Sequence, residues 1–333
     1  MSLTREKIAE VFFGGDAQLA QCLFEKAPDD AALHVPGGAA KNPLLTIDWW
    51  PYLATMLDNR DINAFEFDII QRGAAVHTRA FLDAKSNPSV EAIGKALNQG
   101  ATLRVFGVSR FEANCAMQLQ LLRKVLQREA FVNLYLTPPQ CAGLNLHFDL
   151  EDSIAVQVKG EKIWKLYSSS GGAKYPRELS AGPPPVRGEP TQVIHMRAGD
   201  VLFVPSGLTH TVETLSSSSQ HVTFGVHVQR QATLLSGLLD EFAATEEELR
   251  RPVRSDEKIS KEALAEWAGV FARWLAQRRS GDAGTAKPAA LRYLAVKEQS
   301  STRSYLPPLQ RSSLWYRSGS LAHSAAHMEN RYR

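Results

Sequence analysis

Cysteine is scarce in this sequence, and long apolar runs are missing. The 333 residues include 3 cysteines (Cys22, Cys115 and Cys141), too few and too scattered for a disulfide framework or a cysteine-based zinc site. No uncharged apolar segment reaches the length needed to span a bilayer. The first ten residues are charged where a signal peptide would need an apolar stretch. We therefore predict an intracellular, cytoplasmic protein with no membrane segment.

Net charge is also small, since 38 Lys and Arg against 35 Asp and Glu leave a formal charge of +3. Such a balance does not indicate nucleic-acid binding by the whole chain. Arginine dominates only the last stretch, from Arg303 to Arg333. We interpret it as a solvated tail, and a basic surface for RNA or the ribosome is the alternative.

Hydrophobic periodicity predicts helices in the first part of the chain. Residues 4–26 and 110–128 carry apolar side chains at helical spacing. Residues 88–98 are predicted to form a further helix, with Asn87 as its N-cap and the following proline at its first position. Leu44–Ile47 is a short apolar strand candidate.

Residues 131–228 have a different character. Short β-rich runs alternate there with turn residues, which indicates a sandwich or a jelly-roll barrel. Residues 169–190 are rich in Ser, Gly and Pro and predict a long surface loop near a site. Helical spacing returns after Gln229, and the wide apolar stripe over about 260–279 favours packing against a partner. The predicted fold class is mainly β with helical additions.

The triplet His147-Phe148-Asp149 carries the main chemical signal. Side chains two positions apart on a strand point to the same face, so a strand here would place an imidazole beside a carboxylate. These are two of the three ligands of a non-haem Fe(II) facial triad. A lone H-x-D arises often by chance, so a third ligand is needed. His210 is the best candidate, because it follows a Pro-Ser-Gly break and starts a strand, which fixes a ligand's position.

A co-substrate site is expected beside these ligands. Two histidines and one carboxylate leave positions on iron open for O2 and a bidentate 2-oxo acid. The distal carboxylate of that acid needs a cation on the inner wall of the barrel. Lys162 is the candidate, since it follows the Gly160 turn and shares a strand face with Trp164 and Leu166. A surface lysine in a polar turn is the alternative interpretation.

Two blocks of sequence carry a family resemblance. The first runs from Asn133 to Tyr167 and contains N-L-Y-L-T-P-P, G-L-N-L-H-F-D and D-S-I-A-V-Q-V-K-G-E-K-I-W-K-L-Y, and the second is G-D-V-L-F-V-P-S-G-L-T-H, ending at His210. Together they resemble the JmjC-type 2-oxoglutarate oxygenases. Within these they are most similar to the ribosomal-oxygenase (cupin-4) group, which hydroxylate side chains of ribosomal proteins. The resemblance implies a double-stranded β-helix, Fe(II) as the metal, and 2-oxoglutarate and O2 as co-substrates.

The resemblance assigns three residues as iron ligands: His147, Asp149 and His210. It pairs Lys162 with the distal carboxylate of 2-oxoglutarate, places Tyr135 in the wall of the same pocket, and puts Asn133 at a neighbouring polar position. Some relatives carry a hydroxyl near Gly225 that touches the co-substrate, and Thr223 could replace it.

The group's usual architecture adds a helical dimerisation region and a winged-helix domain. We therefore expect a JmjC/cupin catalytic domain at 1–229 and a helical region at 230–280 that forms a homodimer. A short basic segment would follow at 281–333, as a reduced winged helix or a tail. That segment is short for a full winged helix, so substrate engagement can differ from that of the ribosomal enzymes.

The leading hypothesis is an Fe(II)/2-oxoglutarate hydroxylase that acts on a protein or peptide side chain, such as His or Arg of a ribosomal protein. One alternative is a biosynthetic hydroxylase of a small molecule or a ribosomally made peptide. Another is a catalytically silent JmjC-fold binding protein. A cupin isomerase or a dioxygenase without 2-oxoglutarate would usually use more histidines and would not need Lys162.

Overall fold

The computed structural model describes residues 2–24, 31–59, 61–64, 66–76, 78–167, 188–253 and 258–277. The chain separates into two compact units, with the division between Val228 and Gln229. The predicted loop at 169–190 lies almost wholly outside the described residues, and the predicted C-terminal segment at 281–333 lies entirely outside them.

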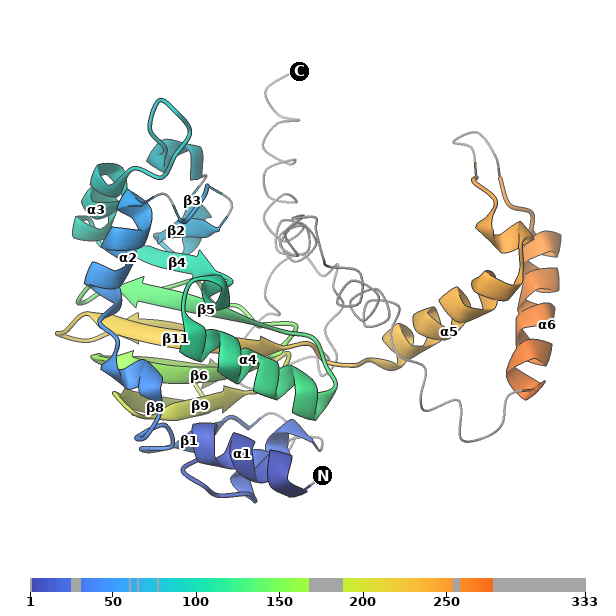
Figure 1. Ribbon diagram of the computed structural model, residues 1–333, viewed down its shortest axis with the longest axis horizontal. Coiled ribbons are helices and arrows are strands. Elements are labelled where there is room, and N and C mark those ends of the chain that lie inside the picture. Colours follow the sequence, from blue (N-terminus) through green and yellow to red (C-terminus); the bar gives the residue numbers. More distant parts are fainter. Residues whose placement is uncertain are drawn as a thin grey trace. The chain divides into compact units, whose positions relative to one another are not determined.

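Two antiparallel sheets build the first unit (Figure 1). The larger has the order β1-β9-β6-β11-β5-β4-β2-β3 and the smaller the order β10-β7-β8. The strands are β1 Leu33–Val35, β2 Phe67–Gln71, β3 Ala74–Val76, β4 Thr102–Phe106, β5 Ala130–Thr137, β6 Asp152–Lys159, β7 Glu161–Tyr167, β8 Gln192–Arg197, β9 Val201–Val204, β10 Thr209–Thr214 and β11 Ser219–Val226. From β8 to β11 successive strands alternate between the two sheets, because β8 and β10 belong to the small sheet and β9 and β11 to the large one.

Helices cover the outer face of the large sheet. They are α1 Ser2–Phe12, α2 Trp49–Asp58, α3 Val90–Asn98 and α4 Ala113–Leu126. Figure 1 shows α4 lying across this face. The apolar side of α4, including Leu119 and Leu122, shares one buried core with Leu134 of β5 and Phe224 of β11. This main core therefore lies between the helices and the large sheet, not inside the barrel.

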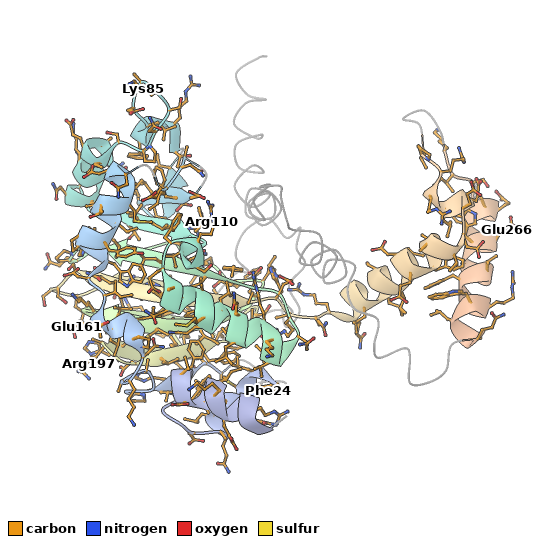
Figure 2. All side chains as sticks on the ribbon, in the orientation of Figure 1. Phe24, Lys85, Arg110, Glu161, Arg197 and Glu266 are labelled. Atoms are coloured by element: carbon orange, nitrogen blue, oxygen red, sulfur yellow. The ribbon has the colours of Figure 1, made fainter. Side chains whose placement is uncertain are left out.

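The space between the two sheets holds a second, smaller core. Its buried members come from both sheets and the connections between them: Ala155, Trp164, Leu166, Met196, Leu202, Val204 and Leu208. Strand β7 alternates between partly exposed and buried residues. Lys162 therefore shares the inner face with Trp164 and Leu166, as the sequence predicts. Glu161 and Arg197, labelled in Figure 2, are paired at the end of the β7–β8 hairpin.

Two local predictions are wrong. Leu44–Ile47 is not a strand, because Pro43–Thr46 forms a 3-10 helix in which the Asn42 side chain accepts a hydrogen bond from the Leu44 N–H. Helix α3 begins later than predicted, because Ser89 caps it by accepting from the Ala92 N–H. Both outcomes follow from side chains that satisfy free backbone donors at a helix start.

The second unit is a pair of helices, α5 Gln231–Thr245 and α6 Lys261–Gln277. They meet through three aromatic rings: Phe242 lies 5.2 Å from Phe271 and 5.5 Å from Trp274, between ring centroids. Among the described residues, no helix is long and apolar enough to cross a membrane.

Candidate metal and co-substrate site

The His147-Phe148-Asp149 segment is not the regular strand that the sequence predicts. It pairs with β10 only through isolated bridges, Ala142 to Glu213 and His147 to His210. From Ala142 to His147 is five steps along the chain, whereas from Glu213 to His210 is three. Two extra residues must therefore bulge out of this segment, and a bulge re-aims the side chains that follow it.

The bulged segment nevertheless brings the three predicted ligands together. Ligand atoms of His147, Asp149 and His210 all lie within 4.8 Å of one another. The His147 Nε2 is 3.8 Å from one carboxylate oxygen of Asp149, and the His210 Nε2 is 3.9 Å from the other. Two imidazoles and a carboxylate converging in this way form a donor set suited to one Fe(II) ion.

Backbone carbonyls orient both imidazoles. The His147 Nδ1 donates to the Asn145 carbonyl at 2.8 Å, and the His210 Nδ1 donates to the Leu208 carbonyl at 2.9 Å. Each Nε2 then keeps a free lone pair for a metal, which is how proteins fix the tautomer of a metal-binding histidine. Burial is the main cause that lowers the pKa of His210 to about 4, so this imidazole is neutral at pH 7.

The Pro-Ser-Gly turn before His210 is tied to the segment after Asp149. The Gly207 N–H donates to the Asp149 carbonyl at 2.9 Å, and the Ser206 hydroxyl donates to the Leu150 carbonyl at 2.8 Å. These bonds join the two chain segments that supply the ligands. The turn therefore has the rigidity that the sequence predicts for a ligand-bearing element.

Lys162 is buried on the inner face of β7, with 3% of its surface exposed. Its Nζ donates to the Thr137 hydroxyl at 3.0 Å and to the His221 Nδ1 at 2.9 Å. The Thr137 hydroxyl carries no charge. Burial holds the pKa of His221 well below its usual range, so this imidazole is neutral as well. Burial also lowers the pKa of Lys162 to about 7. A buried amine without a carboxylate partner among the described residues suits an incoming anion.

Tyr135 and Asn133 lie on the same strand as Thr137, at the period-two spacing of one face. The Tyr135 ring stacks on His221, with centroids 4.6 Å apart and an interplanar angle of 6°. Burial raises the pKa of Tyr135, so its phenol stays protonated. Asn133 is buried, and its side-chain oxygen accepts from the Gly107 N–H at 3.3 Å. Asn133 thus holds the turn that follows β4.

Sequence reasoning missed the part played by Thr137 and His221. Both were detectable by alternation, since Thr137 continues the series Asn133 and Tyr135, and His221 shares a strand face with Thr223. The missing information was the pairing of β5 with β11, which sets His221 opposite Tyr135.

Trp164 lies between the metal cluster and this pocket. Its ring centroid is 5.4 Å from that of His210 and 6.1 Å from that of His221. The Trp164 ring is therefore next to both His210, a predicted metal ligand, and His221, the partner of Lys162.

Packing accounts for the glycine at position 225. A Cβ at Gly225 would overlap the ring of Phe131, the residue paired with it on β5. Thr223, two positions earlier, is buried on the same face as His221. A side chain at position 225 would therefore require the Phe131 ring to move.

An antiparallel two-sheet barrel with a two-histidine, one-carboxylate cluster defines the class of cupin-like, double-stranded β-helix proteins. Within that class, residues 109–234 match the family model described as the JmjC domain. The resemblance and the fold class predicted from the sequence are both confirmed.

Curated relatives match across the same region. Ribosomal oxygenase 1 of Gallus gallus is 29% identical over 174 residues, which is 47% of this chain and 29% of that protein. The bifunctional lysine-specific demethylase and histidyl-hydroxylase NO66 of Drosophila pseudoobscura pseudoobscura is 27% identical over 226 residues, 63% of this chain and 23% of that protein. The chain thus matches less than a third of the length of either relative.

Solved structures of the Escherichia coli ribosomal oxygenase YcfD align at low identity. One has 15% identity and a TM-score of 0.49, covering 78% of this chain and 67% of that chain. Another, in complex with cobalt and 2-oxoglutarate, has 15% identity and the same TM-score of 0.49, with 77% and 66% covered.

Proposed function

We propose that this protein is an Fe(II)- and 2-oxoglutarate-dependent oxygenase that hydroxylates a side chain of a protein or peptide. One observation supports the proposal above all others. A His-Asp-His cluster and a buried lysine without a carboxylate partner among the described residues belong to the same small barrel. Either feature alone also occurs in proteins of unrelated function, but together they match the needs of a metal and an anionic co-substrate.

The residues present fit an Fe(II) ion. Both imidazoles are held with Nε2 free, and the Asp149 carboxylate lies between them. The Ser153 hydroxyl donates to one Asp149 oxygen at 3.4 Å, which limits rotation of the carboxylate. His147, Asp149 and His210 would therefore hold the ion. Their set contains no thiolate, which argues against a structural zinc site.

The residues around Lys162 fit 2-oxoglutarate. The amine would bind the distal carboxylate, and the Thr137 hydroxyl and the Tyr135 phenol on β5 of the large sheet are further groups that can hydrogen-bond it. Asn133 borders the same face. The bound metal, 2-oxoglutarate and O2 would together supply the oxidant, with one oxygen atom entering a C–H bond and the other entering succinate as CO2 leaves.

The substrate class is proposed from the relatives. Their names describe a ribosomal oxygenase and an enzyme acting on lysine and histidine residues of proteins, and each is far longer than the matched region. A protein side chain is therefore the favoured substrate, with a ribosomal protein as the first to test. The thiols of all three cysteines are free, which supports an intracellular location.

The helical unit is proposed as a dimerisation region. Several apolar side chains of this unit remain exposed: Leu234, Leu235, Leu239, Val253, Ile259 and Leu264. Exposing such a surface to water is unfavourable, and a second copy of the chain would cover it. The catalytic residues all belong to the other unit, so we propose residues 1–229 as the catalytic domain and 230–280 as the assembly domain.

Succinate formation tests the activity. The purified chain with Fe(II), 2-oxoglutarate and ascorbate should form succinate slowly even without a substrate, measured by mass spectrometry. His147→Ala and Asp149→Ala should abolish this turnover and weaken Mn(II) binding, which is measurable without catalysis. His195→Ala is the matched control, because His195 hydrogen-bonds Glu161 at 2.6 Å in the β7–β8 hairpin and belongs to neither part of the site. Failure of the wild-type chain to bind 2-oxoglutarate or to form succinate would refute the proposal.

Mass comparison tests the substrate. Ribosomal proteins from cells with and without this gene should differ by the mass of one oxygen atom on one protein. An unchanged set would favour the biosynthetic alternative. It would not bear on the oxygenase chemistry, which the succinate assay tests separately.

A further inference from the structure

His221 differs from most other described histidines in its partner. Three of these lie against carboxylates: His34 against Asp200, His195 against Glu161 and His227 against Glu151. His221 instead lies against the amine of Lys162 and has 5% of its surface exposed. Burial and proximity make the protonated form of each of these two side chains unfavourable. Such a pair therefore suggests a function that requires it.

Three contacts fix the His221 imidazole. Its Nδ1 accepts from the Lys162 Nζ at 2.9 Å, one face stacks on Tyr135, and Trp164 meets it edge-on at 76° with centroids 6.1 Å apart. Together with the Thr137 hydroxyl, the imidazole gives the amine two acceptors in fixed positions. The direction of the Lys162 side chain therefore depends on His221.

Few ionisable groups surround this amine. The residues paired with Lys162 on the neighbouring strands are Thr214 of β10 and Met196 of β8, and neither titrates. Gln157 of β6 is the partner of His221 across the large sheet. On the large sheet, Tyr135 stacks on His221, Arg104 is the residue paired with Tyr135 on β4, and Asp68 is the residue paired with Arg104 on β2.

Arg104 and Asp68 neutralise one another through a two-point ion pair on β4 and β2. The proton on the Lys162–His221 pair therefore has no carboxylate among these groups to hold it. At pH 8 the amine is mostly uncharged, since burial lowers the pKa of Lys162 to about 7.

We propose that His221 is a positioning residue for Lys162, and that the two side chains bind the distal carboxylate of the co-substrate as one pair that takes up a proton from solvent. This inference rests on the proposed function, because the co-substrate is a 2-oxo dicarboxylate. The proton converts the Lys162 amine to an ammonium, which then donates to the bound carboxylate and to the His221 Nδ1. The only bond that forms is the new N–H bond. The positive charge of the resulting ammonium balances the negative charge of the bound carboxylate.

Calorimetry on the wild-type chain tests proton uptake without catalysis. The protein is loaded with Mn(II) and titrated with 2-oxoglutarate at pH 8 in phosphate and in Tris, whose ionisation enthalpies differ. The difference in apparent enthalpy gives the protons exchanged. We expect uptake of most of one proton, and affinity that falls by up to about tenfold per pH unit above pH 7. Binding with no proton uptake would overturn the inference.

Two substitutions separate positioning from simple packing. His221→Phe keeps a ring to stack on Tyr135 but removes the acceptor, and His221→Asn restores an acceptor near the Nδ1 position. We expect His221→Phe to bind 2-oxoglutarate about tenfold more weakly at pH 8, with the loss of affinity beginning at a lower pH. His221→Asn should stay within about threefold of the wild type. A purely structural role would weaken both variants without moving the pH dependence.

The outcomes distinguish this inference from the proposed function. If the wild type does not bind 2-oxoglutarate at all, the proposed function fails. If it binds, and His221→Phe shows the wild-type affinity and pH profile, only the inference fails. Thermal melting reports whether each variant is folded. Should His221→Phe not fold, the wild-type proton count decides the question by itself.

Discussion

At the scale of single residues, the buried amine of Lys162 is an unfavourable feature of the ligand-free protein. Burying a cation without an anion lowers stability, and a protein tolerates this where the group serves a ligand. The pKa of Lys162 is lowered to about 7, so between that pH and its ordinary value near 10.5 the unfolded chain binds more protons than the folded chain. Stability of the ligand-free protein should therefore rise with pH over this window, by up to about 1.4 kcal/mol per pH unit from this group.

Lys162→Met should remove that cost and the binding function together. We expect the variant without ligand to melt at a higher temperature than the wild type at pH 7, and its stability to lose the rise between pH 7 and 10 that this lysine causes. Its affinity for 2-oxoglutarate should fall by about 10- to 100-fold, the value of a charge-assisted hydrogen bond. Thermal melts across pH and calorimetry measure the two effects.

Lys165→Met is the control for this prediction. Lys165 lies on the same strand but faces outward, where its amine pairs with Glu213 at 2.7 Å and its side chain is 36% exposed. A pair of this kind contributes about 0–1 kcal/mol. The control should leave 2-oxoglutarate binding unchanged. Equal loss of affinity in both variants would show that the loss comes from disturbing strand β7 and not from removing the Lys162 amine.

Residue-level prediction from the sequence is most direct where a residue type has few uses. The ligands His147, Asp149 and His210 and the inward-facing Lys162 follow from spacing and residue type without knowledge of strand pairing, and the structure brings the first three together. The hydrogen bond between Lys162 and His221 was not predictable, because it crosses between the two sheets. Such a contact depends on register, and a single sequence does not contain register.

At the scale of elements, the turn between β6 and β7 determines where Lys162 falls. Gly160 has φ +65°, and a Cβ there would overlap the carbonyl oxygen of Ser218. Gly160→Ala should therefore shift the start of β7 and cost about 1–3 kcal/mol of stability. We also expect weaker 2-oxoglutarate binding, because Lys162 follows two residues later, while Mn(II) affinity should change little.

Gly94→Ala provides the matched control for the turn. Gly94 is inside α3, and nothing lies within 4 Å of a Cβ built there. The substitution should stabilise the helix by up to about 1 kcal/mol and leave both ligands' affinities unchanged. Urea unfolding and calorimetry on the two glycine variants measure the contrast. A Gly160→Ala variant as stable as the wild type would contradict the role of this turn.

Helices and strands were predicted well where the apolar repeat extends over many residues. They were predicted poorly where a local hydrogen bond determines the structure. The helices at α4, α5 and α6 and the strands from β5 to β11 follow from apolar spacing. The 3-10 helix at Pro43–Thr46 depends on one Asn42 side chain, and the bulge before His147 depends on two unpaired residues opposite β10. Neither leaves a clear periodic signal.

At the scale of the whole molecule, the proposed chemistry and the proposed assembly belong to different units. All residues of the proposed site belong to the unit that ends at Val228. The helical unit contributes an aromatic contact of its own and a set of exposed leucines. This separation makes the assembly proposal testable without disturbing the site.

The leucines of α5 are the place to test dimerisation. Leu235 and Leu239 lie one turn apart on this helix and are 57% and 50% exposed. Burial of each in a dimer would contribute about 1.5–3 kcal/mol, so Leu235→Glu with Leu239→Glu should weaken dimerisation at least about 100-fold. Light scattering after size exclusion should show a dimer for the wild type and a monomer for the double variant. Ala84→Glu, an exposed position in the catalytic unit, should remain dimeric. Succinate formation without substrate should be equal in all three proteins, because the site residues are elsewhere. A wild-type monomer at every concentration would refute the proposed homodimer while leaving the chemistry of the site unaffected.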